Sequence, residues 1–211
     1  MLSSVLAGFG LGLSLIVAIG AQNLFVLRQG VRREHAWAVA AVCAVSDAAL
    51  IALGVSGLGV LLDAVPWLVD VVRWAGAAFL VAYGVLAARR ALRPSGAALH
   101  VAADDAATGG AVATRTRLAP VLLTCLALTW LNPHVYLDTV FLLGSVAGTH
   151  GDARWWFAAG AITASFAWFF ALALGARRLG RRLSTPRAWR VLDGIIAVVM
   201  IALAVSLVLP R

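Results

Sequence analysis

Residues 129–138 place polar and ionisable groups inside an apolar stretch, where they could bind a ligand. The segment reads Thr-Trp-Leu-Asn-Pro-His-Val-Tyr-Leu-Asp, and the apolar run around it extends from about residue 118 to residue 145. Proline lacks a backbone donor and clashes with the carbonyl four residues earlier, so we expect Pro133 to break a helix and Asn132 to cap the helix that restarts. The new helix N-terminus would carry a partial positive charge, which suits an anionic group of a substrate.

Two ionisable side chains follow this proline closely. His134 and Asp138 are four residues apart, a spacing that lets them pair on one helix face and lowers the cost of burying both. The structural alternative is a plain proline kink, which is common in membrane helices. We favour a functional role, because ionisable residues within an apolar segment are costly and mark substrate or ion paths.

Asp47 is a second candidate group. It lies about twelve residues into an apolar segment, which corresponds to about 18 Å of helix and puts it near the centre of a bilayer. Nothing beside it in the sequence neutralises its charge. We expect it to be protonated, to pair with a helix that the sequence does not identify, or to act as the counter-charge for a proton, a metal ion or a charged substrate.

Further polar residues lie near the ends or breaks of apolar segments. Gln22 and Asn23 follow Gly20 in the first of them and can either bond backbone groups freed by a break or contact a ligand. The residues support both roles equally. Asp193 lies near Arg190 at the start of the last apolar segment, so we expect a boundary salt bridge between them.

The composition indicates the class of protein. Of 211 residues, 63% are hydrophobic and 12% are charged, which leaves too few polar side chains to cover a soluble surface. We therefore predict an integral membrane protein. The net charge of +8 comes from basic residues between the apolar runs, which favours lipid contact and argues against nucleic acid as a partner. Cys43 and Cys125 lie within apolar runs, with neither disulfide spacing nor a metal cluster around them.

Six apolar segments are long enough to span a bilayer. The chain is therefore predicted to be an all-α membrane protein with six transmembrane helices and no soluble domain. The first segment is too long for the apolar core of a signal peptide and has no Lys or Arg before Arg28, so we retain it as a helix. The segments cover approximately residues 2–27, 36–62, 65–88, 118–145, 155–175 and 191–209.

Arginines mark three of the loops. By the positive-inside rule these loops are cytoplasmic, which places both termini outside the cytoplasm. Residues 94–114, rich in Ala, Gly, Ser and Thr, are expected to form a flexible cytoplasmic linker. We thus expect a first repeat over residues 1–91, a linker over 92–117 and a second repeat over 118–211. The arginines of these loops are Arg28, Arg32, Arg33, Arg89, Arg90, Arg93, Arg115, Arg117, Arg177, Arg178, Arg181, Arg182, Arg187 and Arg190, against Arg73, Arg154 and Arg211 on the other side.

The two halves show a faint internal similarity. Residues 44–46 (Ala-Val-Ser) match 163–165 (Thr-Ala-Ser), and residues 74–76 (Trp-Ala-Gly) fall opposite 192–194 (Leu-Asp-Gly) at nearly the same offset. Each half would have three helices. Because three is an odd number of spans, the two halves would enter the membrane from opposite sides. The pattern predicts two inverted three-helix repeats with interrupted helices one and four, the plan of many secondary transporters.

Three motifs carry a resemblance to a known family. They are Gly-Ala-Gln-Asn at 20–23 followed by Phe-Val-Leu-Arg-Gln-Gly at 25–30, Ser-Asp at 46–47 with Gly54 and Gly57 downstream, and Leu-Asn-Pro-His-Val-Tyr-Leu-Asp at 131–138. Over nearly the whole chain apart from the linker, the sequence resembles the LysE family of basic amino-acid exporters, especially its arginine-exporter branch. The related homoserine and threonine exporters usually show Pro-Gly-Pro in their first helix, so Gly-Ala-Gln-Asn here favours a cationic substrate.

The resemblance implies a multi-pass carrier of the bacterial inner membrane that exports L-arginine, and L-lysine as a second candidate, by alternating access. The membrane potential or a coupling ion, a proton or sodium, would drive it. In this scheme the helix start at Asn132 and the break near Gln22 hold the α-carboxylate, while Asp47 or Asp138 faces the cationic side chain. The matching substrate-binding residues are Gln22, Asn23, Asp47, Asn132, Pro133 and Asp138, and the candidate coupling groups are Asp47, Asp138 and, from the local argument, His134.

Other functions have less support in the sequence. An enzyme would need a nucleophile with its base, a His/Glu metal motif or a phosphate loop, and the sequence offers none of these. A channel or a divalent-cation exporter would have only one strong ligand pair, His134 with Asp138. Export of a neutral amino acid is a further alternative. We expect no cofactor and no resident metal; the expected partners are a basic amino acid and the lipid bilayer, and a homodimer stays open.

Overall fold

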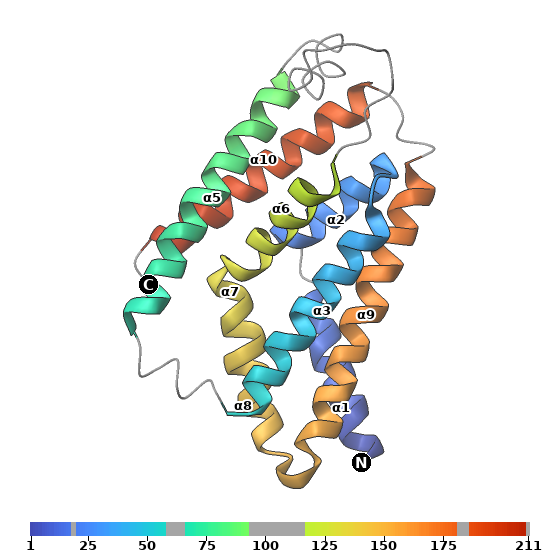
Figure 1. Cartoon of the computed structure of the whole chain (residues 1–211), viewed down its shortest axis with the longest axis vertical. Coiled ribbons are helices and arrows are strands. Elements are labelled where there is room, and N and C mark those ends of the chain that lie inside the picture. Colours follow the sequence, from blue (N-terminus) through green and yellow to red (C-terminus); the bar gives the residue numbers. More distant parts are fainter. Residues whose placement is uncertain (18–19, 58–65, 93–116, 181–185, 210–211) are drawn as a thin grey trace.

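The computed structural model describes residues 1–17, 20–57, 66–92, 117–180 and 186–209, and every regular element within these ranges is helical. Figure 1 shows how the elements are arranged. The helices are α1 (Leu2–Ile16), α2 (Ala21–Arg32), α3 (Ala36–Val55), α5 (Pro66–Leu92), α6 (Leu118–Trp130), α7 (Pro133–Val135), the π-helix η1 (Tyr136–Leu142), α8 (Leu143–Gly148), the 3-10 helix η2 (Gly151–Ala153), α9 (Arg154–Leu179) and α10 (Pro186–Val208).

Four of these helices, α3, α5, α9 and α10, are long and apolar enough to cross a membrane. Two further spans result if each bent pair is one span: α1 with α2, whose axes differ by 79°, and α6 with the helical stretch Pro133–Gly148, at 57°. The all-helical prediction is confirmed. The predicted linker at 94–114 lies outside the described residues, as do residues 58–62 of the second predicted segment.

The arginine-rich ends of the helices gather at one end of the molecule. The C-terminal ends of α2, α5 and α9 and the start of α10 lie at the top of Figure 1, while the N-terminus, α8 and the starts of α5 and α9 lie lower in the view. Arg32, Arg90 and Arg178 belong to those upper ends. This separation agrees with the asymmetry of the sequence, and the assignment of the upper end to the cytoplasm stays a prediction.

Small residues let α1 pack closely on α9. Gly8 and Gly12, four residues apart, are both buried. A methyl group added at Gly8 would overlap the backbone carbonyl of Phe157, and one added at Gly160 would overlap that of Val5. Close backbone contact of this kind is the main packing force between helices in lipid, where burial of apolar surface contributes little. It holds the first half of the broken helix against α9.

Helices α5 and α10 pack mainly against each other and lie side by side in Figure 1. One of their contacts with the remaining helices is at Gly76 of α5, where an added methyl group would overlap the carbonyl of Leu131, next to the break after α6. Another is a buried ion pair between Asp193 of α10 and Arg28 of α2. The predicted pairing of Asp193 with Arg190 is wrong: Arg190 instead donates from Nε to the Ala91 carbonyl at 3.0 Å, because it points toward α5.

Candidate functional site

The first helix break is held together by Asn23. Helix α1 ends at Ile16, and α2 begins at Ala21 after Gly20 in extended conformation. Asn23 donates from Nδ2 to the Ile16 carbonyl at 2.7 Å, which satisfies a group left free by the end of α1. Its Oδ1 accepts from the indole nitrogen of Trp168 on α9 at 3.2 Å. Both the nitrogen and the oxygen of the Asn23 amide thus bond to the protein itself. Of the two roles predicted for Asn23, this supports the structural role.

The second break has the predicted form. Asn132 is the N-cap of the restarted helix, and its Oδ1 accepts from the His134 backbone N–H at 3.1 Å, while Pro133 takes the first helical position. The hydroxyl of Tyr136 donates to the Trp130 carbonyl at 2.8 Å, which satisfies a carbonyl at the end of α6. The sequence therefore predicted this break and its cap correctly.

The helix after the break is a π-helix from Tyr136 to Leu142, and it contains Asp138. Such i→i+5 segments are rare and often occur at functional sites. No direct ion pair joins the described residues His134 and Asp138, although His134 still acts electrostatically on the Asp138 carboxylate. His134 Nε2 lies 3.5 Å from the Ser206 hydroxyl of α10.

Asp47 is nearly enclosed, with 3% of its surface exposed. Its Oδ2 accepts from the Ser165 hydroxyl of α9 at 2.9 Å. The partner helix that the sequence did not identify is therefore α9. The Ser165 hydroxyl and the nearby Gln22 amide are neutral and do not balance a buried negative charge, so a proton or a cationic ligand is still required.

The two serines of the internal match, Ser46 and Ser165, bond residues next to this site but do not line the cavity. Ser46 accepts from the Trp130 indole at 3.2 Å, beside the second break, while Ser165 donates to Asp47. The sequence match indicated that these positions correspond, but the contacts between the helices could not be derived from it.

Both breaks line one cavity of about 320 Å³. Asp47 and Asp138 also face it, and Pro133 makes the break without lining the cavity. Thr139, Phe169 and Ser206 are lining residues that the sequence reasoning missed; Ser206 stands alone in an apolar helix, a signal that could have identified it. The full lining is Leu15, Ile16, Gly20, Ala21, Gln22, Asn23, Asp47, Asn132, His134, Val135, Asp138, Thr139, Phe169, Leu203 and Ser206.

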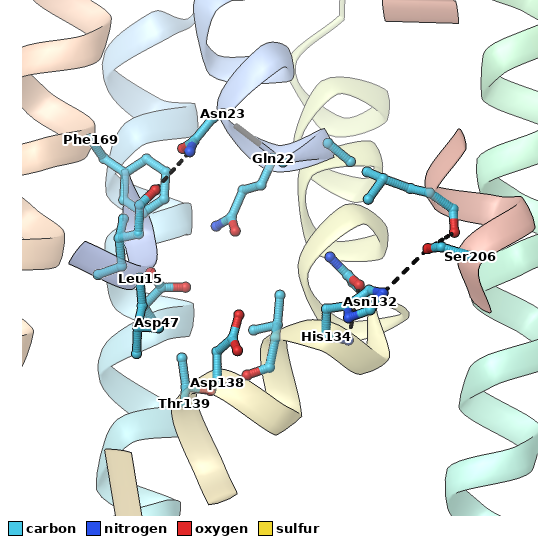
Figure 2. Close-up of a pocket in the computed structure, with 15 residues that line it drawn as sticks. Leu15, Gln22, Asn23, Asp47, Asn132, His134, Asp138, Thr139, Phe169 and Ser206 are labelled. Atoms are coloured by element: carbon cyan, nitrogen blue, oxygen red, sulfur yellow. Dashed lines mark hydrogen bonds between the residues drawn. The ribbon is translucent and has the colours of Figure 1, made fainter. Parts of the chain in front are cut away.

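The cavity has two chemically different walls. Figure 2 shows the carboxylates of Asp47 and Asp138 on one side with the amide of Gln22 above them, and His134 with Ser206 on the other side. Gln22 Nε2 is buried and has no hydrogen-bond partner among the described residues. An unpaired buried donor beside a cavity is costly unless a ligand or water occupies it.

The start of the restarted helix offers fewer free donors than the sequence implied. Pro133 has no N–H, the His134 N–H is bonded to the Asn132 side chain, and the Val135 N–H donates to the Asn132 carbonyl at 3.1 Å. The positive end of the helix dipole still faces the cavity, but the N–H groups are already satisfied. Among the described residues, no three His, Cys, Asp or Glu side chains gather as metal ligands.

Comparison with known proteins finds relatives that match nearly the whole chain. A protein of Mycobacterium tuberculosis provisionally named as an amino-acid transporter is 48% identical over 193 residues, covering 92% of this chain and 90% of the relative. A lysine exporter of Corynebacterium efficiens is 42% identical over 221 residues, covering 96% of both chains. An arginine exporter of Salmonella enteritidis is 42% identical over 208 residues, covering 98% of this chain and 94% of the relative.

No solved structure matches the chain significantly. The model of the family described as LysE type translocator matches residues 13–211. With a match of this extent and several apolar helices, the chain belongs to the LysE family and is a multi-pass protein of the bacterial inner membrane.

Proposed function

We propose that this protein exports a cationic L-amino acid, arginine or lysine, from the cytoplasm. The observation that carries the proposal is the pair of carboxylates, Asp47 on α3 and Asp138 on the π-helix, that face one cavity. Among the described lining residues there is no Lys or Arg to neutralise them. A site with this charge in a poorly hydrated interior favours a cationic ligand. The names of the lysine and arginine exporters among the relatives support the same substrate class.

The cavity volume supports a small substrate. About 320 Å³ lies at the lower end of the range for ligand pockets, which suits a single amino acid better than a peptide. Its two walls suit the two ends of arginine. Asp47, Asp138 and Gln22 face the guanidinium group, which donates in a planar fork to carboxylate and amide oxygens.

The opposite wall receives the α-carboxylate. His134 lies there with the positive end of the helix that starts at Pro133, and its imidazole can donate a hydrogen bond. The Ser206 hydroxyl donates to the Leu203 carbonyl at 2.8 Å, so it holds this wall in place beside His134. Asn132 and Asn23 then act by holding the breaks in place, because their side chains already bond the backbone. Asp47, His134 and Asp138 are the titratable groups of the cavity, so a coupling proton would be carried by them; sodium is the alternative ion.

Transport follows an alternating-access cycle in six spans built as two inverted repeats, residues 1–91 and 118–211. Corresponding helices of the two halves pack against each other, α3 with α9 and α5 with α10, and the two broken helices meet at the cavity. This arrangement supports exchange of two states about a fixed central site. Both termini then lie outside the cytoplasm. A reporter that is active only in the cytoplasm, fused after the last residue, should be silent, and activity there would contradict the three-plus-three scheme.

Transport assays in vesicles test the substrate. We expect arginine and lysine, each supplied on the cytoplasmic side, to be transported, while threonine and divalent cations are not. Transport of threonine without arginine would replace the proposal with neutral amino-acid export. Transport of a divalent cation would instead make the two carboxylates its ligands.

A further inference from the structure

A buried charge cluster lies away from the cavity, at the arginine-rich end of the molecule. Asp193 Oδ1 of α10 lies 3.3 Å from Arg28 Nη2 of α2 and 3.4 Å from Arg90 Nε of α5. Arg28 and Asp193 are each 7% exposed. Tyr83 of α5 accepts from Arg28 Nη1 at 3.2 Å, and the Arg90 guanidinium lies 5.7 Å from the centre of the Tyr83 ring. We call Arg28, Arg90 and Asp193 the triad.

The triad joins two groups of helices that otherwise share few contacts. It ties α2 to the pair α5 and α10, which pack mainly against each other. The same pair meets the second break at Gly76 against Leu131, and it meets the cavity wall through Ser206 and His134. Asp193 and Ser206 are about 20 Å apart along α10 by helical rise, so the triad and the cavity lie at different heights of the same helix.

This geometry allows the triad to open by a small rotation. If α5 and α10 turn together about the close contact of Gly76 with Leu131, a rotation of about 10° moves a point about 20 Å away by about 3 to 4 Å, which breaks ion pairs of the observed length. Packed helices of this kind move as rigid bodies between two discrete arrangements more readily than the individual helices bend.

The charges of the triad are unbalanced. Two guanidinium groups share one carboxylate, and Arg28 Nε and Arg90 Nη2 are buried with no hydrogen-bond partner among the described residues. Opening would expose these N–H groups to water, which offsets part of the lost ion-pair energy. While closed, the excess positive charge opposes the passage of a cation.

We propose that the Arg28–Asp193–Arg90 triad is a latch that closes the arginine-rich, cytoplasmic end of the transport path and must separate before the cavity can load. The proposal rests on the proposed function for the existence of a path, and it adds the residues that control access to it. Arg28, Arg90 and Asp193 act by positioning the helices and do not touch the substrate.

Thiol labelling tests the latch without any substrate. Val135 lines the cavity and is close in size to cysteine, so Val135→Cys reports access to the cavity. In inside-out vesicles, a membrane-impermeant maleimide should label this cysteine at least about tenfold faster when Asp193→Asn is added, because removing one partner leaves the two buried arginines uncompensated and favours separation. The chain without Val135→Cys gives the background from the buried Cys43 and Cys125.

Two further variants make the result specific. Asp70→Asn removes a carboxylate from an exposed position at the far end of α5 and should leave the labelling rate unchanged. Asp193→Glu keeps a carboxylate between the two arginines and should leave labelling slow. Equal rates in all variants that insert would overturn the latch. If Asp193→Asn does not insert, Tyr83→Phe removes only one hydrogen bond to Arg28 and should still raise the rate, and no rise would also overturn it.

The result of the labelling test does not depend on whether the proposed function is correct. Labelling depends on access alone, so the latch can stand or fall whether or not arginine is exported. Protection of the Val135→Cys thiol by added arginine reports substrate binding in the same vesicles. Fast labelling after Asp193→Asn without protection by arginine would support the latch and contradict the substrate.

Discussion

The two helix breaks face the same cavity but satisfy their free backbone groups differently. At the first break, Asn23 donates to the Ile16 carbonyl and accepts from Trp168, so this break depends on contact with α9. At the second break, Asn132 caps the helix start and Tyr136 bonds the carbonyl of Trp130, all within a short segment of chain. Both breaks thus satisfy a free carbonyl from within their own segment, and at the first break the same side chain is also bonded to α9 through Trp168.

A second difference is that the helix breaks and the charged groups of the cavity come from different parts of the chain. Both breaks contribute neutral amides to the cavity, whereas the carboxylates come from α3, which is not interrupted, and from the π-helix. We therefore infer that the breaks form the cavity and bring polar backbone groups to it, whereas the carboxylates determine the charge of the ligand. The predictions below test whether these roles can be separated.

The largest effect is expected at Asp47, which supplies charge and not shape. Asp47→Asn keeps an oxygen that can accept from Ser165 but removes the negative charge. We expect the apparent affinity for arginine to fall roughly tenfold to more than a hundredfold, for an interaction worth about 1.5 to 3 kcal/mol. The change in affinity is measured by arginine binding to the reconstituted protein, and its consequence by arginine export.

Insertion into the membrane should survive this change, because neutralising a buried charge does not disfavour folding. Asp152→Asn, at an exposed position outside the cavity, is the matched control and should export normally. A coupling role for Asp47 gives a different pattern: exchange of arginine persists while accumulation against a gradient is lost. Unchanged binding, exchange and accumulation would remove Asp47 from the mechanism.

The next effect compares the same substitution at the two breaks. Asn23→Asp loses the donor to the Ile16 carbonyl and places a carboxylate against it, so the free energy of unfolding should fall by about 2 to 3 kcal/mol. Asn132→Asp keeps the accepting oxygen and the cap but adds a carboxyl group to a buried position, so the loss should be smaller than at Asn23, about 1 kcal/mol. Thermal unfolding in detergent compares them. Equal losses would show that the second break also depends on its amide N–H₂.

The same contrast explains how much of the site could be predicted from the sequence. Proline chemistry and capping act over a few residues, so the break at Pro133 and its cap were predictable. The apolar segments were predictable from their length and composition, because a helix needs about 20 apolar residues to span a bilayer.

Other features depend on which helices become neighbours. Ser165 beside Asp47, Trp168 beside Asn23 and Arg28 beside Asp193 come from segments far apart in the chain, and no local pattern specifies them. The π-helix is also outside sequence reasoning, because its composition does not differ from that of an α-helix. The contact of His134 with Ser206 of α10, like the contacts above, joins segments far apart in the chain.

A smaller effect is expected where α5 touches the second break. Gly76→Ala places a methyl group onto the Leu131 carbonyl, a backbone atom that cannot move freely, and should cost about 1 to 2 kcal/mol. Gly10→Ala is the matched control, since nothing lies near an added methyl group there and alanine favours the helix. Unfolding of both variants in detergent measures the difference. A tolerated Gly76→Ala would mean that α5 does not hold the second break.

The smallest effect is expected at Tyr136, which satisfies the second break from within its own segment. Tyr136→Phe keeps the ring and removes the hydroxyl that bonds the Trp130 carbonyl, so stability should fall by about 0.6 to 1.5 kcal/mol, as for one hydrogen bond in a membrane protein. Unfolding in detergent checks the value, and arginine binding should be unchanged because Tyr136 does not line the cavity. A loss of binding at unchanged stability would contradict the assignment, because it would place the hydroxyl in the substrate path instead of at the helix end.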